Sequence, residues 1–159
     1  MTPLPPPGPE NQYLSEHAAL LRRSFRALTG GRELIAPEAT EAETARALYH
    51  APFVVLSHDS APDPIFNYGN RLALDLFELT WDELTAMPSR LTAEAPDREA
   101  RARLLAEVDR RGFIDDYSGV RISRQGRRFR IARATVWNLT DVQGRPRGQA
   151  ATFGEWQLL

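Results

Sequence analysis

The chain has 159 residues, of which 42% are hydrophobic and 26% are charged, and its formal net charge is −1 at pH 7. These totals predict one globular domain with a self-sufficient core. Because the chain has no cysteine, disulfides, thiolate metal sites and cysteine nucleophiles are excluded. No window offers the roughly 20 apolar residues of a membrane helix, and the N-terminus lacks the regions of a signal peptide. We therefore expect a cytoplasmic protein.

The charges are unevenly distributed, and all 20 basic residues are arginine. Residues 1–96 hold 13 acidic residues and 7 arginines, whereas residues 97–159 hold 8 acidic residues and 13 arginines. The planar guanidinium groups of arginine bind anions and nucleic acid. A genome rich in arginine codons explains the absence of lysine more simply. A net charge near zero argues against a dedicated nucleic-acid binder, so no nucleic-acid partner is expected.

The first 50 residues predict a tail followed by two helices. Residues 1–12 are rich in proline and are expected to be a disordered tail. Apolar side chains at helical intervals predict a helix over Tyr13 to Thr29, and a second helix is expected over Pro37 to His50. Residues 13–50 are therefore assigned to a helical extension, which either packs on the sheet or pairs with another protomer.

Two short strands and a capped helix follow. Apolar runs predict strands at Phe53 to Leu56 and at Ile65-Phe66. Asn67, Gly69 and Asn70 then have turn chemistry, and Gly69 can adopt a positive φ without a steric penalty. Asn70 stands where a helix N-cap belongs, and leucines recur at helical spacing from there to Leu79.

Two further helices are predicted in the middle of the chain. Thr80 and Glu83 have the spacing of a capping box, which predicts a short helix over Trp81 to Met87. A longer helix is expected over Asp97 to Arg110, because alanine, leucine, glutamate and arginine dominate there. Its expected apolar face consists of Ala100, Leu104 and Val108.

The last third of the chain predicts an antiparallel meander of three strands over residues 113–123, 128–139 and 148–156. Alternation in the second strand places five side chains on one face; these are Phe129, Ile131, Arg133, Thr135 and Trp137. The element order predicts an α+β fold with a single antiparallel sheet of about five strands, helices on one face, and preceding N-terminal helices.

With this element order, the chain resembles a PAS domain, and residues from about Pro52 to Trp156 closely resemble the MEKHLA family. That family is a PAS-like module found alone in bacteria and algae, and at the C-terminus of plant homeodomain–leucine-zipper transcription factors. The resemblance rests on the stretches PFVVLSHD, DPIFNYGNRLALDLFEL, MPSRLTAE, YSGVRIS, GRRFRI, VWNL and GQAATF. It implies that residues 51–159 form a PAS-like domain in which Asn70 begins a small helix beside a ligand cavity.

The residue types argue against several reactive centres. Flavin photoreceptors of the PAS class use a reactive cysteine, and haem-binding PAS sensors commonly take a histidine from the connecting helix. This chain has no cysteine, and its predicted connecting helix contains no histidine. The dispersed His17, His50 and His58 predict no metal site. Consecutive residues of an extended chain point to alternate faces, so residues 57–60, SHDS, cannot form a catalytic triad by themselves. We expect no enzyme, and the cofactor stays unknown.

Aromatic and polar side chains form the candidate pocket. A buried arginine needs a carboxylate partner or an anionic ligand. Arg90 or Arg121 is therefore expected to bind a small carboxylate, or else to pair with an acidic residue of the chain, namely Glu94, Asp115 or Asp116. The aromatic residues either line an apolar pocket or form ordinary core. The candidate lining residues are Tyr68, Asn70, Phe77, Trp81, Ser89, Arg90, Tyr117, Arg121, Phe129 and Trp137.

Together these expectations describe a stand-alone, non-enzymatic sensory or interaction module that signals through pocket occupancy and association. The alternative is a homodimerisation domain with a filled core, and a small α+β enzyme is the third hypothesis. The expected partners are a small-molecule ligand and either a second copy of the chain or another protein. No membrane partner is expected.

Overall fold

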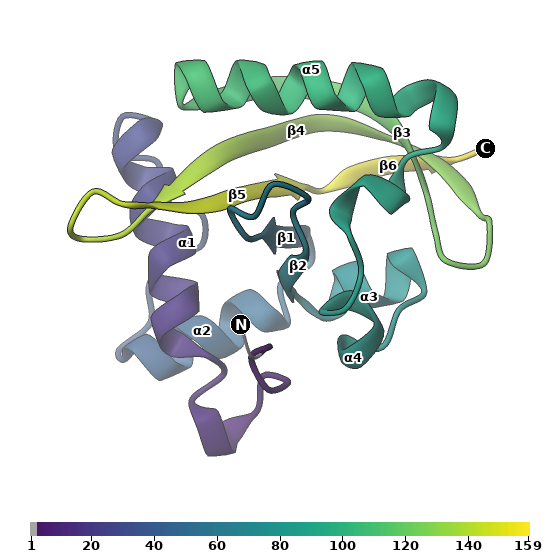
Figure 1. Cartoon of the computed structure of the whole chain (residues 1–159). Coiled ribbons are helices and arrows are strands. Elements are labelled where there is room, and N and C mark those ends of the chain that lie inside the picture. Colours follow the sequence, from purple (N-terminus) through teal and green to yellow (C-terminus); the bar gives the residue numbers. More distant parts are fainter. Residues whose placement is uncertain (1–2) are drawn as a thin grey trace.

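A computed structural model describes residues 3–159 and shows an α+β fold built on one antiparallel sheet (Figure 1). The order of the strands is β2-β1-β5-β4-β3, and β6 pairs with β4 beyond the end of β5. This architecture confirms the predicted fold class. The strands are β1 (Val54–His58), β2 (Phe66–Gly69), β3 (Phe113–Ile122), β4 (Arg128–Thr140), β5 (Pro146–Phe153) and β6 (Glu155–Leu158).

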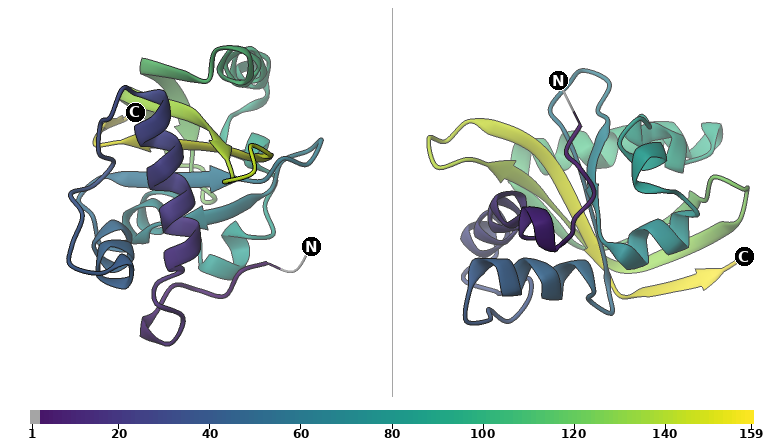
Figure 2. Two further views of the ribbon diagram at one scale, coloured as in Figure 1. Left: turned by 90° about the vertical axis from the view of Figure 1, so that its left-hand side faces the viewer. Right: turned by 90° about the horizontal axis from the view of Figure 1, so that it is seen from below.

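Helices cover both faces of the sheet, as the view from below in Figure 2 shows. One face carries α1 and α2, and the other carries α3 and α5, while α4 lies by the edge strand β2 and contributes Trp81 to one core cluster and Leu84 to the other. The N-terminal helices thus dock on the sheet, which settles one of the alternatives left open by the sequence. The helices are α1 (Ser15–Leu28), α2 (Glu41–Tyr49), α3 (Arg71–Phe77), α4 (Trp81–Leu84) and α5 (Ala95–Arg111), with 3-10 turns at Pro9–Asn11 and Ser89–Thr92.

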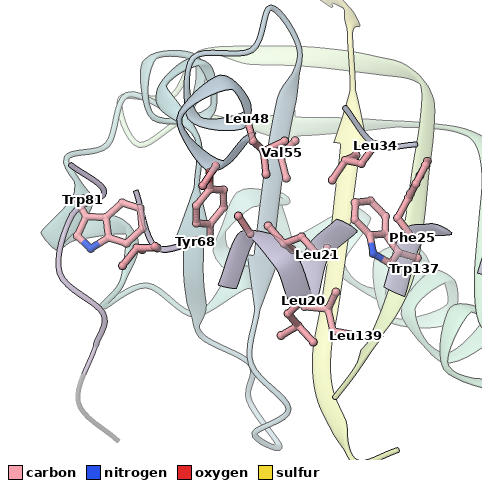
Figure 3. Close-up of a cluster of buried hydrophobic side chains, with 14 residues drawn as sticks. Leu20, Leu21, Phe25, Leu34, Leu48, Val55, Tyr68, Trp81, Trp137 and Leu139 are labelled. Atoms are coloured by element: carbon pink, nitrogen blue, oxygen red, sulfur yellow. The ribbon is translucent and has the colours of Figure 1, made fainter. Parts of the chain in front are cut away.

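A well-packed cluster joins α1 to the sheet, and we call it the α1 cluster (Figure 3). Leu21 and Phe25 lie one turn apart on the helix and are both buried. The ring of Phe25 meets the ring of Trp137 edge-on, with 5.0 Å between centroids. Such aromatic pairs add to the free energy gained from burying apolar area. The side of α1 that bears these residues is therefore occupied within the chain.

The proline-rich segment is placed against the domain, in contrast to the disordered tail predicted for residues 1–12. Its 3-10 turn is closed by a hydrogen bond of 3.0 Å from the backbone N–H of Gly8 to Oδ1 of Asn11. The indole Nε1 of Trp81 donates to the carbonyl of Leu4 at 2.8 Å. Prolines lack an N–H donor, so side chains supply these anchoring bonds. Residues 1 and 2 of the predicted tail lie outside the described residues.

Local capping chemistry positions the small helices as predicted. Oδ1 of Asn70 accepts from the backbone N–H of Ala73 at 3.2 Å, which confirms the N-cap of α3. Thr80 and Glu83 form the predicted capping box at the start of α4. The turn predicted at Gly69 is wrong, because this residue lies inside β2. A Cβ there would lie 2.9 Å from a methyl group of the α4 residue Leu84, so the glycine serves close packing.

The predicted alternation along β4 breaks at Arg133, whose φ is 54°. The register of β3 and β4 shifts on both sides of the pair Tyr117–Ala134, and Asp116 beside this pair also has a positive φ, 56°. A bulge reverses which face the following side chains occupy. Consequently Phe129 and Ile131 pack toward α3, whereas Trp137 packs beneath α1. The prediction that these three residues share one face is therefore wrong.

Candidate ligand-binding cavity

A cavity of about 60 Å³ lies between the sheet and α5. Its floor includes Leu56, Val136 and Ala151, which are register partners on β1, β4 and β5. Leu104 and Leu105 of α5 cover it. Since one water molecule needs about 10–15 Å³, this space holds a molecule of about four to six heavy atoms.

The position of α5 follows from a stripe of side chains that faces the sheet. Arg101, Leu104, Leu105 and Val108 have the spacing i, i+3, i+4, i+7, which places them on one side of a helix. Val108 is fully buried, and the other three are half-buried. Ala100, predicted to lie on this face, is instead exposed. The stripe therefore begins with a charged side chain at the cavity.

The guanidinium of Arg101 reaches into the protein. Its Nη2 donates to the hydroxyl of Ser89 at 2.9 Å, and Ser89 is completely buried. Burial, reinforced by the charge of Arg121, lowers the pKa of Arg101 to about 10. The group is therefore still protonated at neutral pH.

Arg121 of β3 is the second cation at the cavity and is 9% exposed. Its Nη1 donates to the carbonyl of Val120 at 2.8 Å, and its Nη2 donates to the hydroxyl of Tyr117 at 3.2 Å. Its Cζ also lies 5.6 Å from the centre of the Tyr117 ring. All of these partners are neutral. Among residues 3–159, neither Arg121 nor Arg101 forms an ion pair with a carboxylate.

His58 supplies a hydrogen-bond acceptor to the same lining. Its Nδ1 lies 2.9 Å from the carbonyl oxygen of Asp59. A carbonyl only accepts, so Nδ1 carries the proton. Burial lowers the pKa of His58, and the charge of Arg101 lowers it further, so the ring is neutral at pH 7. Nε2 is buried without a partner among the described residues and is available to a donor group of a ligand.

The lining combines these polar groups with an apolar remainder. Thr92 directs its hydroxyl to the carbonyl of Ser89 at 2.9 Å, and the Gln149 amide donates to the carbonyl of Leu105 at 3.1 Å. With two cations and no opposing carboxylate among the described lining residues, the cavity is suited to an anion. The polar lining includes His58, Thr92, Arg101, Tyr117, Arg121 and Gln149, and the apolar lining includes Leu56, Phe66, Phe77, Ile131 and Phe153.

The structure brings half of the predicted pocket residues to this region. Phe77, Tyr117 and Arg121 line the cavity. Phe129 lies beside it, and the centroid of its ring is 5.2 Å from the centroid of the Phe77 ring. Ser89 lies next to the lining, and its hydroxyl accepts the hydrogen bond from Arg101 of α5. These five residues lie on the face of the sheet that α3 and α5 cover.

The other five predicted residues lie elsewhere. Tyr68, Trp81 and Trp137 belong to the α1 cluster on the opposite face of the sheet (Figure 3). Asn70 is completely buried, and its side chain hydrogen-bonds backbone groups of Leu48, Phe53, Val55 and Ala73. Arg90 is exposed and pairs with a carboxylate of the loop before β2. The structure therefore does not place these residues beside the cavity, because both faces of the sheet are covered and aromatic character does not distinguish them.

Sequence reasoning missed Arg101, His58 and Gln149. The helical spacing of Arg101 with the leucines of α5 was a signal that could have identified it. His58 and Gln149 are register partners on β1 and β5. Their approach depends on pairing between strands that are far apart in the sequence, which no local pattern shows.

A larger groove of about 770 Å³ runs between α1 and the β4–β5 hairpin. It is rich in arginine, but four of its five arginines pair with a carboxylate. Arg22 pairs with Glu41 at 3.3 Å, and Arg145 pairs with Asp141 at 3.1 Å. Hydrogen bonds from Arg145 hold the pKa of Asp141 below its usual value. The smaller cavity, whose cations lack carboxylate partners, is therefore the stronger candidate.

The comparison with known sequences identifies a family. The MEKHLA domain model matches residues 15–158, a range that includes the helices assigned above to a separate extension. Homeobox-leucine zipper protein HOX33 of Oryza sativa subsp. indica is 25% identical over 156 residues, which are 98% of this chain and 18% of that protein. Homeobox-leucine zipper protein ATHB-9 of Arabidopsis thaliana is 26% identical over 96 residues, which are 60% of this chain and 11% of that protein. The chain thus spans less than a fifth of these curated relatives.

Solved structures confirm the PAS-like fold. The PAS domain of a protein from Colwellia psychrerythraea has a TM-score of 0.59 at 12% identity, covering 74% of this chain and 94% of that chain. The light-state dimer of the fungal blue-light photoreceptor Vivid gives 0.60 at 14% identity, covering 87% and 93%. At these identities the likeness concerns the fold alone. No helix of the described residues is long and apolar enough to cross a membrane.

A flavin does not fit this cavity. A light-oxygen-voltage domain from a study with a flavin analogue shares the fold, with a TM-score of 0.55 at 18% identity over 74% of this chain and 84% of that chain. Pockets for ligands of drug size have volumes of about 300–1,000 Å³, whereas this cavity has about 60 Å³. The chain also has no cysteine to form a covalent adduct. The arrangement is suited to a much smaller molecule.

Proposed function

The chain belongs to the MEKHLA domain family, and we propose that it is a sensory module in which a small ligand occupies the cavity under α5 and alters the packing of that helix. Family membership and the PAS-like fold support a sensory role. The observation that carries the proposal is the cavity itself, which lies between the sheet and a long helix and is lined by cations without carboxylate partners.

The weak anchoring of α5 supports its role as the moving part. Among residues 97–111, only Val108 is fully buried. The helix ends at Gly112, whose φ of 95° favours glycine, and β3 follows directly. Segments with few buried apolar contacts open at low free-energy cost. A ligand that contacts α5 and the sheet more favourably in one helix position will shift the population toward that position.

The proposed role is non-enzymatic, and the surroundings of Ser57 support this. Its hydroxyl donates to Oδ1 of Asn67 at 2.5 Å and lies 2.9 Å from Nε2 of His17. A nucleophilic serine must give its proton to a base, but this proton is directed to an amide oxygen. Ser57 is also 1% exposed, so the pair is not accessible to a substrate.

Thermal denaturation tests the sensory proposal with a panel of carboxylates, amides, alcohols and amines of about four to six heavy atoms. Ala151→Val fills the cavity floor, and Ala132→Val on β4, outside the cavity lining, is the matched control. At about ten times its Kd, a ligand adds about 1.4 kcal/mol and raises Tm by about 3–6 °C. At least one compound should do so in the wild type and in Ala132→Val but not in Ala151→Val. Failure of every compound would contradict the proposal.

A homodimerisation domain without a ligand is the second candidate. The small volume of the cavity, about 60 Å³, favours it because few atoms are missing from an otherwise packed core. The relative Vivid is described as a dimer in its light state. Native mass spectrometry distinguishes the two functions. A dimer without bound mass, together with no thermal shift from any compound, would support this second function in place of the sensor.

A further inference from the structure

The geometry points to a small carboxylate as the ligand of the α5 cavity, bound between Arg101 of α5 and Arg121 of β3. This inference rests on the proposed function, because it names the chemistry of the same site. A buried charge without a counter-ion is unfavourable. Two cations at one cavity, Arg121 buried and Arg101 half-buried, with no carboxylate paired to either among residues 3–159, indicate that the balancing anion comes from outside the chain.

The two guanidinium groups have donors available for an anion. Each guanidinium has five N–H donors. Arg101 uses one of them on Ser89, and Arg121 uses two, on Val120 and Tyr117. The charge of Arg121 also lowers the pKa of Arg101, so the two cations interact unfavourably. An anion between them converts this repulsion into two attractions and joins α5 to β3.

The remainder of the lining selects a carboxylate over an inorganic anion. Phe77, Leu104 and Ile131 present apolar surface to the same cavity. Phosphate or sulfate would place charged oxygens against these side chains, which is unfavourable. A short alkyl chain would contact them favourably. With room for about four to six heavy atoms, the cavity suits an acid of two to four carbons.

Isothermal titration calorimetry of the full chain with propionate and propionamide tests the inference. The two molecules have nearly the same shape, but only propionate is charged. Propionate should bind the wild type, and propionamide should bind about tenfold more weakly or not at all, because charge-assisted hydrogen bonds are lost. Inorganic phosphate, titrated at the same ionic strength, should also bind more weakly than propionate.

Variants locate the binding site. Arg101→Met and Arg121→Met remove one cation each while keeping an unbranched apolar side chain, and each should weaken propionate binding by about tenfold or more. Arg103→Met is the matched control on α5, because Arg103 is exposed and pairs with Glu99. It should bind propionate like the wild type. Circular dichroism verifies folding, and the comparison of propionate with propionamide needs no variant.

The outcomes separate this inference from the sensory function. If propionamide or phosphate binds as tightly as propionate, the carboxylate is wrong but the cavity remains a ligand site. If Arg103→Met weakens binding as much as Arg101→Met, the site is wrong. If propionate does not bind while another compound of the panel stabilises the wild type but not Ala151→Val, only the inference fails. If no compound binds, both fail.

Discussion

His17 connects α1 with the sheet and makes stability depend on pH. Its ring stacks on Tyr68 with 5.5 Å between centroids, and its Nε2 lies 2.9 Å from the hydroxyl of Ser57. Burial, reinforced by the charge of Arg147, lowers the pKa of His17 from 6.5 to about 4. The folded state therefore binds a proton less readily than the unfolded state, and acid favours unfolding.

The expected result is a loss of stability below about pH 6.5. Above this value the ring is neutral in both states and contributes no pH dependence. Between about pH 6.5 and pH 4 the free energy of unfolding should fall, by at most about 3 kcal/mol for this half-buried group, and below pH 4 its contribution should level off. Urea denaturation across this range measures the loss.

His17→Gln and His50→Gln form the matched pair for this prediction. Glutamine keeps a nitrogen donor for Ser57 but does not titrate, so His17→Gln should reduce the slope between about pH 6.5 and pH 4. His50 is exposed, and its replacement should leave the slope unchanged. Equal slopes in the wild type and in His17→Gln would show that burial of His17 does not govern the acid response.

At the scale of the elements, local chemistry predicted what depends on neighbouring residues. The caps at Asn70 and Thr80 were identified correctly because a capping side chain and the N–H that it accepts from are three residues apart. The bulge at Arg133 was not, because it depends on how β4 pairs with β3, where the register shifts on both sides of the pair Tyr117–Ala134. The local sequence around a residue does not show which residue it will face across a sheet. The face of Trp137 was misassigned for this reason.

Gly148 of β5 lies close against the end of β1 and adjoins Gln149 of the cavity lining. Its φ is 116°, and a Cβ there would lie 1.9 Å from the carbonyl oxygen of His58. Gly148→Ala should therefore disrupt the pairing of these strands. Gly144 also has a positive φ, 81°, but a Cβ there meets nothing within 4 Å. Both substitutions strain the backbone, but only Gly148→Ala adds a steric clash.

The free energy of unfolding, measured in urea, separates these two effects. Gly148→Ala should cost about 2 kcal/mol more than Gly144→Ala, which is the typical scale of an overpacked site. It should also weaken ligand binding, because His58 lines the cavity. Equal costs for the two variants would mean that β1 and β5 can separate at this point without loss.

At the scale of the whole molecule, the two faces of the sheet have different roles. The face under α1 and α2 is filled by the α1 cluster, and the face under α5 contains the cavity with Arg101 and Arg121. Because the two faces cannot be told apart from the sequence, only half of the predicted lining residues lie at the cavity. Burial could be inferred for Tyr68 and Phe77 alike, but the order of the strands decides which face each residue occupies. We propose that α1 and α2 are part of the sensory domain, which the family match from residue 15 supports.

An NMR titration that follows the backbone amides of the full chain with propionate tests the central claim, that a small anion occupies the α5 cavity. We predict that the largest shift changes occur around Arg101 in α5 and around Tyr117 and Arg121 in β3. The amides of Arg145 and Arg147, in the groove beside α1, should not respond. Changes confined to these hairpin arginines, or none at saturating propionate, would contradict the account.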